Sequence, residues 1–317
     1  FNGRSQFGCG IYAMTVHGGR RSTSARAYLE PARGRPNLTV LTDALALSLA
    51  FEGRRAVGVT VVRGARTETH RASREVVLAL GAIGSPQLLL LSGVGPADEL
   101  RRLGIAVVAD VPGVGANLHD HPDVPVQYTC LRRELSFSRY LRADRALWLG
   151  ARYLLTGGGP GAAAFWSAGA FKAFSPGAEV PDLQAFFTPM VIKEDPRGSS
   201  GGGGTRLLDA GIFAARKHAI DGFQFDVNQM HPRSRGTLRL RSTDPREHPA
   251  LDPRYLAEEI DRRDMVEAVK MAREIAHQKA FEGVRGAELS PGAELKTDAQ
   301  ILEGLRRTLI SGYHPVG

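Results

Sequence analysis

Hydrophobic and polar residues alternate with a period of two along the first third of the chain. The strand-like runs are NLTVLT (37–42), ALALSLAF (44–51), AVGVTVV (56–62) and REVVLAL (74–80), separated by polar turn sequences such as EGRR and RGAR. Alternation bounded by turns is typical of short antiparallel strands. The pattern therefore predicts a meander over residues 37–80, and the continuous apolar run in its last strand indicates burial on both faces.

A glycine-containing break and a run of leucines follow, in GAIGSPQLLLLSG (81–93). Gly81 and Gly84 suit a turn, Ser85 suits a helix N-cap and Pro86 suits the first helical position. A strand, a glycine turn and a helix N-terminus in succession form the arrangement that receives phosphates or a nucleotide. A purely structural turn from strand to helix accounts for the same residues nearly as well, so both interpretations stay open at this point.

The rest of the chain predicts a second sheet and several helices. Apolar residues at helical spacing indicate an amphipathic helix over residues 138–155, and DGFQFDVNQM (221–230) and GTLRLRS (236–242) alternate like strands. A further helix is predicted from the apolar residues Met265, Val269, Ala272 and Ile275, and another from a capping box at Thr297 and Gln300. A second domain is therefore expected to begin after about residue 122.

Composition and charge narrow the class of protein. The chain has 317 residues, 43% of them hydrophobic, and no apolar run long enough to span a membrane. The formal net charge is +8, but the arginines are spread along the chain without a basic stripe and interleaved aromatics, which argues against nucleic-acid binding. We expect a globular cytoplasmic protein without a transmembrane segment, with attachment to a membrane surface left open.

Several separate motifs resemble one known family. GAIGSPQLLLLSGVGP, followed by LGIAVVADVPGVGANLHDHP, resembles the second signature region of the glucose–methanol–choline (GMC) oxidoreductases, which are FAD-dependent alcohol-oxidising enzymes. Residues 18–42, residues 231–256 and the terminal YHPVG resemble further segments of the family in the family's order. The resemblance is greatest to the choline-dehydrogenase-like branch and extends over nearly the whole chain.

The resemblance implies an α/β (α+β) fold in two parts. Residues 1–122 would be the remainder of a Rossmann-like FAD-binding domain with its β-meander. Residues 123–317 would be a substrate-binding domain with an antiparallel sheet and helices, leading into the catalytic-histidine motif. The family's glycine-rich FAD-binding motif would lie before Phe1, and further flavin contacts would follow Gly317. We therefore expect the chain to be a fragment that, taken alone, has little affinity for FAD and no alcohol-oxidising activity.

The same resemblance assigns the candidate site residues. His314 would be the general base that takes the hydroxyl proton as hydride moves to flavin N5, and Tyr313 would lie against the flavin. Ala46 occupies the meander position whose backbone meets the adenine in the family, although an ordinary sheet alanine is the alternative. The residues expected to line the adenosine end of FAD are Gly81, Ala82 and Ser85.

Other polar residues near these motifs have local roles in this interpretation. Asn117 and His121 are expected to hold a turn through side-chain hydrogen bonds, and His231 and Arg235 are expected to be scaffold. Asp120 lies between two histidines, but one carboxylate and two histidines in a turn more often make local hydrogen bonds than bind a metal. We expect no metal site.

The expected reaction is oxidation of the CH–OH group of a primary alcohol, choline-like or other, to an aldehyde. The electron acceptor would be oxygen, a quinone or another carrier, and the sequence does not distinguish an oxidase from a dehydrogenase. Two alternatives remain open. One is a hydroxynitrile lyase of the same family, which would bind FAD without reducing it. The other is a truncated chain without catalytic activity.

Overall fold

The computed structural model describes residues 3–162, 166, 168–174, 179–192 and 219–317. The chain forms two compact units, each assembled from segments that are distant in sequence. Unit 1 comprises Phe1–Pro31, His121–Arg233 and Glu258–Tyr313, and unit 2 comprises Ala32–Asp120, Ser234–Ala257 and His314–Gly317. The expected mixture of helices and antiparallel sheets is confirmed. The functional division into a cofactor part, 1–122, and a substrate part, 123–317, stays a prediction.

Unit 1 is built on an antiparallel seven-stranded sheet. The order is β1-β10-β11-β14-β9-β17, and β18 also pairs with β9. The strands are β1 (Gly8–Ile11), β9 (Pro122–Cys130), β10 (Ala168–Lys172), β11 (Leu183–Thr188), β14 (Gly222–Gln229), β17 (Arg285–Ser290) and β18 (Ile310–Ser311). Two short pairs accompany it, β2 (Val16–His17) with β3 (Arg20–Arg21) and β12 (Val191–Ile192) with β13 (Ala219–Ile220).

The helices of unit 1 follow the predicted periodicity. They are α4 (Ala143–Thr156), α7 (Glu259–Ala276) and α8 (Asp298–Thr308), with short turns η2 (Arg133–Leu135), η3 (Phe137–Leu141), η4 (Pro160–Ala162) and η5 (Lys279–Phe281). Near the N-terminus lie η1 (Ala25–Leu29) and α1 (Glu30–Ala32). The capping box of α8 is confirmed, because the Thr297 hydroxyl accepts from the Gln300 N–H while the Gln300 side chain accepts from the Thr297 N–H.

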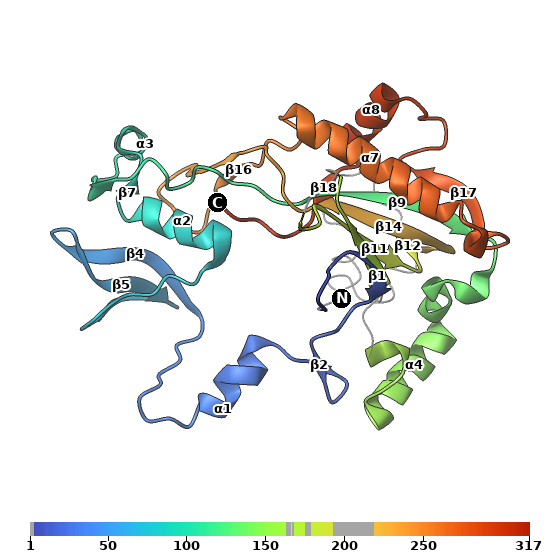
Figure 1. The fold of residues 1–317 in the computed structure, drawn as a ribbon. Coiled ribbons are helices and arrows are strands. Elements are labelled where there is room, and N and C mark those ends of the chain that lie inside the picture. The colour runs from blue at the N-terminus through green and yellow to red at the C-terminus, as the bar shows by residue number, and fades with distance from the viewer. Residues whose placement is uncertain (1–2, 163–165, 167, 175–178, 193–218) are drawn as a thin grey trace. The chain divides into compact units, whose positions relative to one another are not determined.

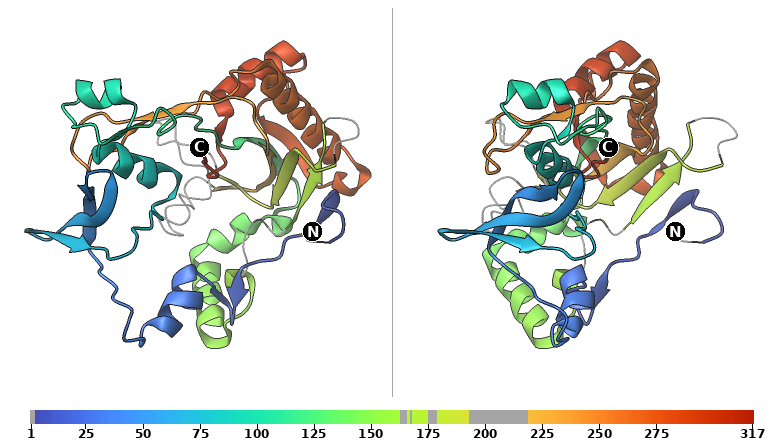
Figure 2. Two further views of the ribbon diagram at one scale, coloured as in Figure 1. Left: turned by 60° about the vertical axis from the view of Figure 1, so that its left-hand side comes forward. Right: turned by 90° about the vertical axis from the view of Figure 1, so that its left-hand side faces the viewer.

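The sheet of unit 1 has two faces of opposite character. Helix α7 lies along one face (Figure 1), and Figure 2 shows it from two further sides, with α7 and α8 in orange to red. Phe223, Phe225 and Val227 of β14 point to this face, where aromatic rings including Phe187 and Phe281 pack together. The alternate residues of β14 are polar and point to the opposite face.

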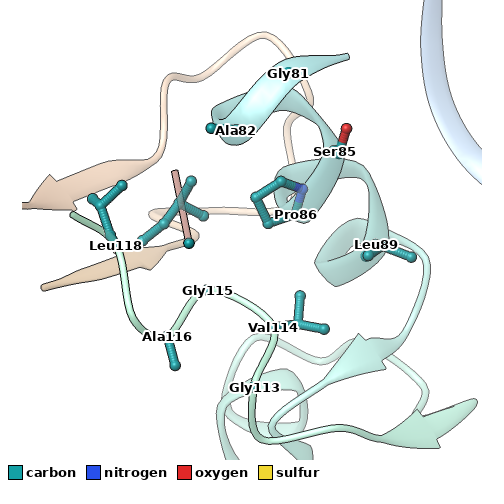
Figure 3. Close-up of a pocket in the computed structure, with 12 residues that line it drawn as sticks. Gly81, Ala82, Ser85, Pro86, Leu89, Gly113, Val114, Gly115, Ala116 and Leu118 are labelled. Atoms are coloured by element: carbon teal, nitrogen blue, oxygen red, sulfur yellow. The ribbon is translucent and has the colours of Figure 1, made fainter. Parts of the chain in front are cut away.

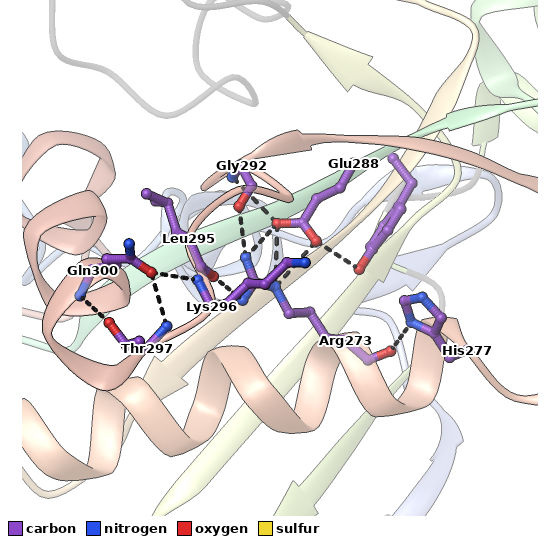
Figure 4. Close-up of polar contacts among 9 residues, drawn as sticks. Arg273, His277, Glu288, Gly292, Leu295, Lys296, Thr297 and Gln300 are labelled. Carbon is purple, nitrogen blue, oxygen red and sulfur yellow. Dashed lines mark hydrogen bonds and ion pairs between the residues drawn. The ribbon is translucent and has the colours of Figure 1, made fainter.

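An ion-pair network ties α7 to the sheet (Figure 4). Arg273 donates three hydrogen bonds to the Glu288 carboxylate, with Nε to Oε2 at 3.1 Å, Nε to Oε1 at 3.2 Å and Nη2 to Oε1 at 2.7 Å. It also donates to the carbonyl oxygens of Gly292 and Leu295, at 2.8 and 2.7 Å. The Tyr128 hydroxyl donates to the same carboxylate, and burial together with Glu288 raises the pKa of the Tyr128 phenol. Both members of this buried ion pair are therefore satisfied.

Unit 2 contains the predicted meander. Its strands are β4 (Ala44–Glu52), β5 (Arg55–Arg63) and β6 (Arg66–Arg71), which form an antiparallel three-stranded sheet. The other elements are α2 (Gly81–Leu91), α3 (Ala97–Arg102), the parallel pair β7 (Val94–Gly95) and β8 (Ala109–Asp110), and the pair β15 (Thr237–Arg239) and β16 (Ala250–Asp252). Leu90, Leu100 and Leu238 form its buried centre.

Two of the predicted strands were wrong. Residues 37–42 and 74–80 lie outside the strands of the structure. The second run was expected to be buried on both faces, yet Val77 is 76% exposed and Leu80 is 45% exposed. A strand needs a neighbour to pair its N–H and C=O groups, and no strand in the described residues pairs with this run. The apolar pattern was read correctly, but the hydrogen-bonding partner that turns such a pattern into a strand is a tertiary property.

The helix after this run begins earlier than predicted. Helix α2 starts at Gly81, and Pro86 lies inside it rather than at its first position. Ser85 is not the N-cap, because its hydroxyl accepts a hydrogen bond at 3.2 Å from the N–H of Leu80, which precedes the helix. The predicted helix over 138–155 is present as η3 followed by α4, which ends at Gly157 in the left-handed conformation, with a φ of 63°.

Candidate functional site

Unit 2 contains a cavity of about 330 Å³ beside the N-terminal half of α2 (Figure 3). Three of the predicted cofactor residues, Gly81, Ala82 and Ser85, line it. The opposite wall is the glycine-rich segment from Gly113 to Leu118, and Gly317 and Leu238 also contribute. The structure thus brings together residues of the predicted strand-to-helix turn and residues far from it in the sequence.

The walls of this cavity consist largely of backbone because several lining residues are glycine or alanine. Gly81 has a φ of 78°, and a Cβ built on it would meet nothing within 4 Å, so it faces open space. Gly115 has a φ of 81°, and a Cβ there would lie 2.3 Å from the Leu238 carbonyl oxygen. A side chain at residue 115 would therefore clash as well as strain the backbone. A ligand in the cavity would meet main-chain groups directly.

Pro86 has a further effect on this wall. Proline has no N–H, so it cannot donate the usual helical hydrogen bond to the carbonyl group four residues earlier. In α2 that group belongs to Ala82, and both residues line the cavity. The interruption of the helical ladder therefore falls at the cavity wall, where a hydrogen-bond donor from a ligand could replace the missing N–H.

The C-terminal segment of unit 2 holds His314 by its main chain. The N–H of His314 donates to Oδ1 of Asp120 at 2.8 Å, and the Tyr255 hydroxyl donates to Oδ2 of the same carboxylate at 2.7 Å. Asp120 is only 5% exposed. Two further bonds, between the main chains of His119 and Val316, fix the next residues at 2.8 and 2.9 Å. The backbone of this segment is thereby anchored, whereas the His314 residue itself is exposed.

Tyr313 and Ala46 lie outside the residues that line the cavity. Tyr313 belongs to unit 1, is 53% exposed, and has a φ of 61°, which is uncommon for a residue with a side chain. Its N–H donates to the Ser311 hydroxyl at 2.9 Å. Ala46 is a half-buried residue of β4 that pairs with Val61. The roles assigned to these two residues, and to His314, stay predictions.

The sequence did not predict that Asp120 holds the main chain of His314 or that Tyr255 bonds to Asp120. Asp120 was interpreted as a local turn residue, but both of its carboxylate oxygens accept bonds from residues that are 135 or more positions away in sequence. No local pattern could have shown this pairing. In the described part of the chain, no group of three or more His, Cys, Asp or Glu side chains is placed to hold a metal ion, and no helix has the length and apolar character needed to cross a membrane.

Comparisons with known proteins agree with the motifs. Two family models described as GMC oxidoreductase match residues 1–123 and 232–317. The oxygen-dependent choline dehydrogenase of Brucella anthropi is 40% identical over 317 residues, which is 100% of this chain and 54% of that protein. The mitochondrial choline dehydrogenase of Homo sapiens is 39% identical over 314 residues, covering 99% of this chain and 50% of that protein.

A solved structure also matches nearly the whole of this chain and about half of its own. The pyridoxine 4-oxidase from Mesorbium loti superposes with a TM-score of 0.77 and 26% identity, over 98% of this chain and 53% of that one. The chain therefore spans about half the length of the curated relatives it matches and of this solved neighbour.

Proposed function

Because the chain belongs to the GMC oxidoreductase family, whose cofactor is FAD, we propose that it is part of an enzyme that oxidises the CH–OH group of a primary alcohol to an aldehyde. The observation that carries the proposal is a pair of features of unit 2. One is a cavity with backbone walls at the turn into α2, and the other is a histidine on a separately anchored segment. The names of the relatives favour choline or a similar alcohol as substrate.

The residues around the cavity fit a part of FAD. Ligand pockets commonly have volumes of about 300–1,000 Å³, so the cavity is large enough for a portion of the dinucleotide. Gly81 and Gly115 leave space and expose main-chain groups, and the Ala82 carbonyl lacks its usual helical donor. We assign Gly81, Ala82 and Ser85 to the adenosine end of the cofactor. When bound, FAD would supply the acceptor for the hydride.

His314 would accept the hydroxyl proton of the alcohol. Loss of this proton must accompany departure of the hydride, and imidazole is suited to take it because histidine titrates close to neutral pH. Asp120 and Tyr255 would act as positioning residues, since Asp120 holds the main-chain N–H of His314 and Tyr255 holds the Asp120 carboxylate. Small displacements of a catalytic group cost large factors in rate. A rigid main-chain anchor is therefore consistent with a general base.

The test is anaerobic reduction of the flavin in the FAD-loaded, full-length enzyme that contains this chain. We expect a primary alcohol to bleach the oxidised flavin, and His314→Ala to slow the reduction roughly 100- to 10,000-fold while FAD stays bound. His277→Ala is the matched control, because His277 is an exposed histidine at the end of α7. An unchanged reduction rate in His314→Ala would remove this residue from the role of base. Bound FAD that no alcohol reduces would instead favour the hydroxynitrile lyase alternative.

A further inference from the structure

Gly236 lies between the two segments of unit 2 that hold the main chain of His314. One is the segment 117–120, whose last residue, Asp120, accepts the His314 N–H. The other is the turn after β16, which carries Tyr255, the second partner of the Asp120 carboxylate. Gly236 is buried and immediately precedes β15. A change in the volume of this residue would therefore reach both segments.

The first contact of Gly236 is a pair of main-chain hydrogen bonds with Leu118. The Gly236 N–H donates to the Leu118 carbonyl oxygen at 2.6 Å, and the Leu118 N–H donates to the Gly236 carbonyl oxygen at 3.1 Å. The two residues thus exchange both bonds, as a hydrogen-bonded antiparallel pair does. Leu118 is 6% exposed and lies two residues before Asp120. The place of Asp120 therefore depends on where Gly236 lies.

The second contact is a close approach of Gly236 to the residues that follow β16. A Cβ built on Gly236 would overlap the Asp252 carbonyl oxygen and would lie 2.7 Å from Cα of Pro253. Both atoms belong to the main chain, so neither can move aside by a change of rotamer. The φ of Gly236 lies outside the left-handed region. The requirement for glycine at residue 236 therefore comes from space and not from backbone conformation.

The turn after β16 is held in a restricted conformation. Arg254 and Leu256 have φ values of 51° and 58°, which are uncommon for residues with a side chain. The Arg254 N–H donates to Oδ1 of Asp252 at 3.1 Å, which fixes the start of the turn. Backbone in such a conformation persists only where the surrounding structure holds it. The Tyr255 hydroxyl is therefore presented by a turn that has little freedom to adjust.

A larger residue at 236 could fit in two ways, and both would disturb the Asp120 carboxylate. Displacement of residues 252–253 would move the turn and draw the Tyr255 hydroxyl away from its 2.7 Å bond to Oδ2. Displacement of residue 236 itself would instead move Leu118, and with it the Oδ1 atom that accepts the His314 N–H. Glycine avoids both displacements because it has no Cβ.

We propose that Gly236 is a positioning residue for His314, because its lack of a side chain sets the spacing between the Tyr255 turn and the Asp120 segment. The effect on catalysis rests on the proposed function, whereas the effect on the main chain of His314 does not. The alternative is a glycine that only allows β15 and β16 to pair and has no influence on residue 314.

The first test measures the main-chain anchor by hydrogen exchange in the full-length enzyme that contains this chain. In Gly236→Ala we expect the His314 N–H to exchange about 10-fold faster or more, because its bond to Asp120 opens more often. Selective ¹⁵N labelling of histidine also reports the His277 N–H, which donates to the Arg273 carbonyl oxygen and should not change. Equal exchange of the His314 N–H in the variant and the unchanged enzyme would overturn the proposal.

The second test is anaerobic flavin reduction at a saturating concentration of primary alcohol. We expect Gly236→Ala to slow the reduction about 10- to 100-fold while FAD stays bound, since a displacement of about 1 Å has an effect of this size. Gly34→Ala is the matched control, because Gly34 also belongs to unit 2 and a Cβ there would meet nothing within 4 Å. It should change neither rate. A lower melting temperature of Gly236→Ala without slower reduction would contradict the proposal.

A double-mutant cycle tests the route through Asp120. Tyr255→Phe removes the hydroxyl that Gly236 is proposed to keep in place, so the two substitutions should not act independently. We expect the double variant to be slower than the slower single variant by less than about threefold. Multiplication of the two single effects would contradict the shared route.

A second variant is available if Gly236→Ala does not fold. Asp252→Ala loosens the same turn from an exposed residue, because it removes the acceptor of the Arg254 N–H. It should also speed exchange of the His314 N–H, and unchanged exchange contradicts the proposal.

The two measurements separate this proposal from the proposed function. Faster exchange at His314 in Gly236→Ala, in an enzyme whose flavin no alcohol reduces, would support the positioning of the main chain and remove the role of His314 as base. Flavin reduction that depends on His314, with exchange and rate unchanged in Gly236→Ala, would do the reverse.

Discussion

The two faces of the unit 1 sheet treat buried carboxylates differently. On the α7 side, Glu288 is matched by the guanidinium group of Arg273, and aromatic rings fill the remaining space. On the opposite side, Asp226 receives hydrogen bonds from Gln224 and Thr188 but no cation among the described residues. Removing the cation of the first carboxylate leaves an uncompensated buried charge, whereas neutralising the second carboxylate removes one. The contrast therefore predicts opposite effects of substitution on the two faces of the sheet.

The largest expected effect on stability comes from removing the cation of the Arg273–Glu288 ion pair. Arg273→Leu would leave the Glu288 carboxylate buried without its cation, and would also remove the donors to the Gly292 and Leu295 carbonyl oxygens. Leaving a buried ion uncompensated typically costs about 3–5 kcal/mol. We expect the free energy of unfolding, measured with urea, to fall by that amount. A change below about 1 kcal/mol would mean that this ion pair does not hold α7 to the sheet.

Neutralising Asp226, which has no cation among the described residues, should change the stability in the opposite direction. Asp226→Asn removes a buried charge, and the Thr188 hydroxyl can rotate to accept from the new amide. At pH 7 we expect the variant to be more stable than the unchanged protein, by about 1–3 kcal/mol. Thermal melting at pH 7 measures this. Clear destabilisation would show that the Asp226 carboxylate is part of the scaffold after all.

The pH dependence sharpens this prediction. The pKa of Asp226 is higher in the folded protein, at about 6, than its ordinary value of 3.8. The folded state therefore binds this proton more tightly, and the free energy of unfolding falls as pH rises from about 4 to about 6. The stability difference between Asp226→Asn and the unchanged protein should be large at pH 7 and shrink as the pH approaches 4. A difference that is constant with pH would contradict the assigned titration.

The smallest effect is expected where an ion pair is exposed. Arg306 and Glu303 on α8 pair at 3.3 Å, but their side chains are 59% and 55% exposed. Such pairs contribute roughly 0–0.5 kcal/mol because solvent screens them. Arg306→Ala should therefore leave the urea midpoint nearly unchanged, which makes it the control for Arg273→Leu. A loss of stability as large as that of Arg273→Leu would show that burial does not explain why the two ion pairs contribute differently.

Alternation in the sequence predicted which residues of β14 share a face, but not what they contact. GFQFDVNQ places Gln224, Asp226 and Asn228 on one side from the period of two alone. Two of the partners of Asp226, Thr188 of β11 and Trp166, are distant in sequence, and no local rule brings them to it. Helix α7 and the capping box of α8 were predictable because their signals lie within a few residues.

The candidate site was predictable to a similar degree. Gly81, Ala82 and Ser85 were found as a turn with small residues, and they do line a cavity. The other wall, at Gly113 to Leu118, and the pairing of Asp120 with Tyr255 depend on long-range packing. The run 74–80 shows the same limit, because its apolar residues were recognised while the pairing they require was not.

The anchor of His314 has a consequence for natural variation at this position. Asp120 bonds the main-chain N–H of residue 314, and every amino acid except proline carries that group. This main-chain hydrogen bond thus does not depend on which side chain residue 314 carries, proline excepted. If homologous chains that keep the Asp120 and Tyr255 pair all carry histidine at 314, selection for chemistry is the explanation, since eighteen other amino acids could make the same main-chain hydrogen bond.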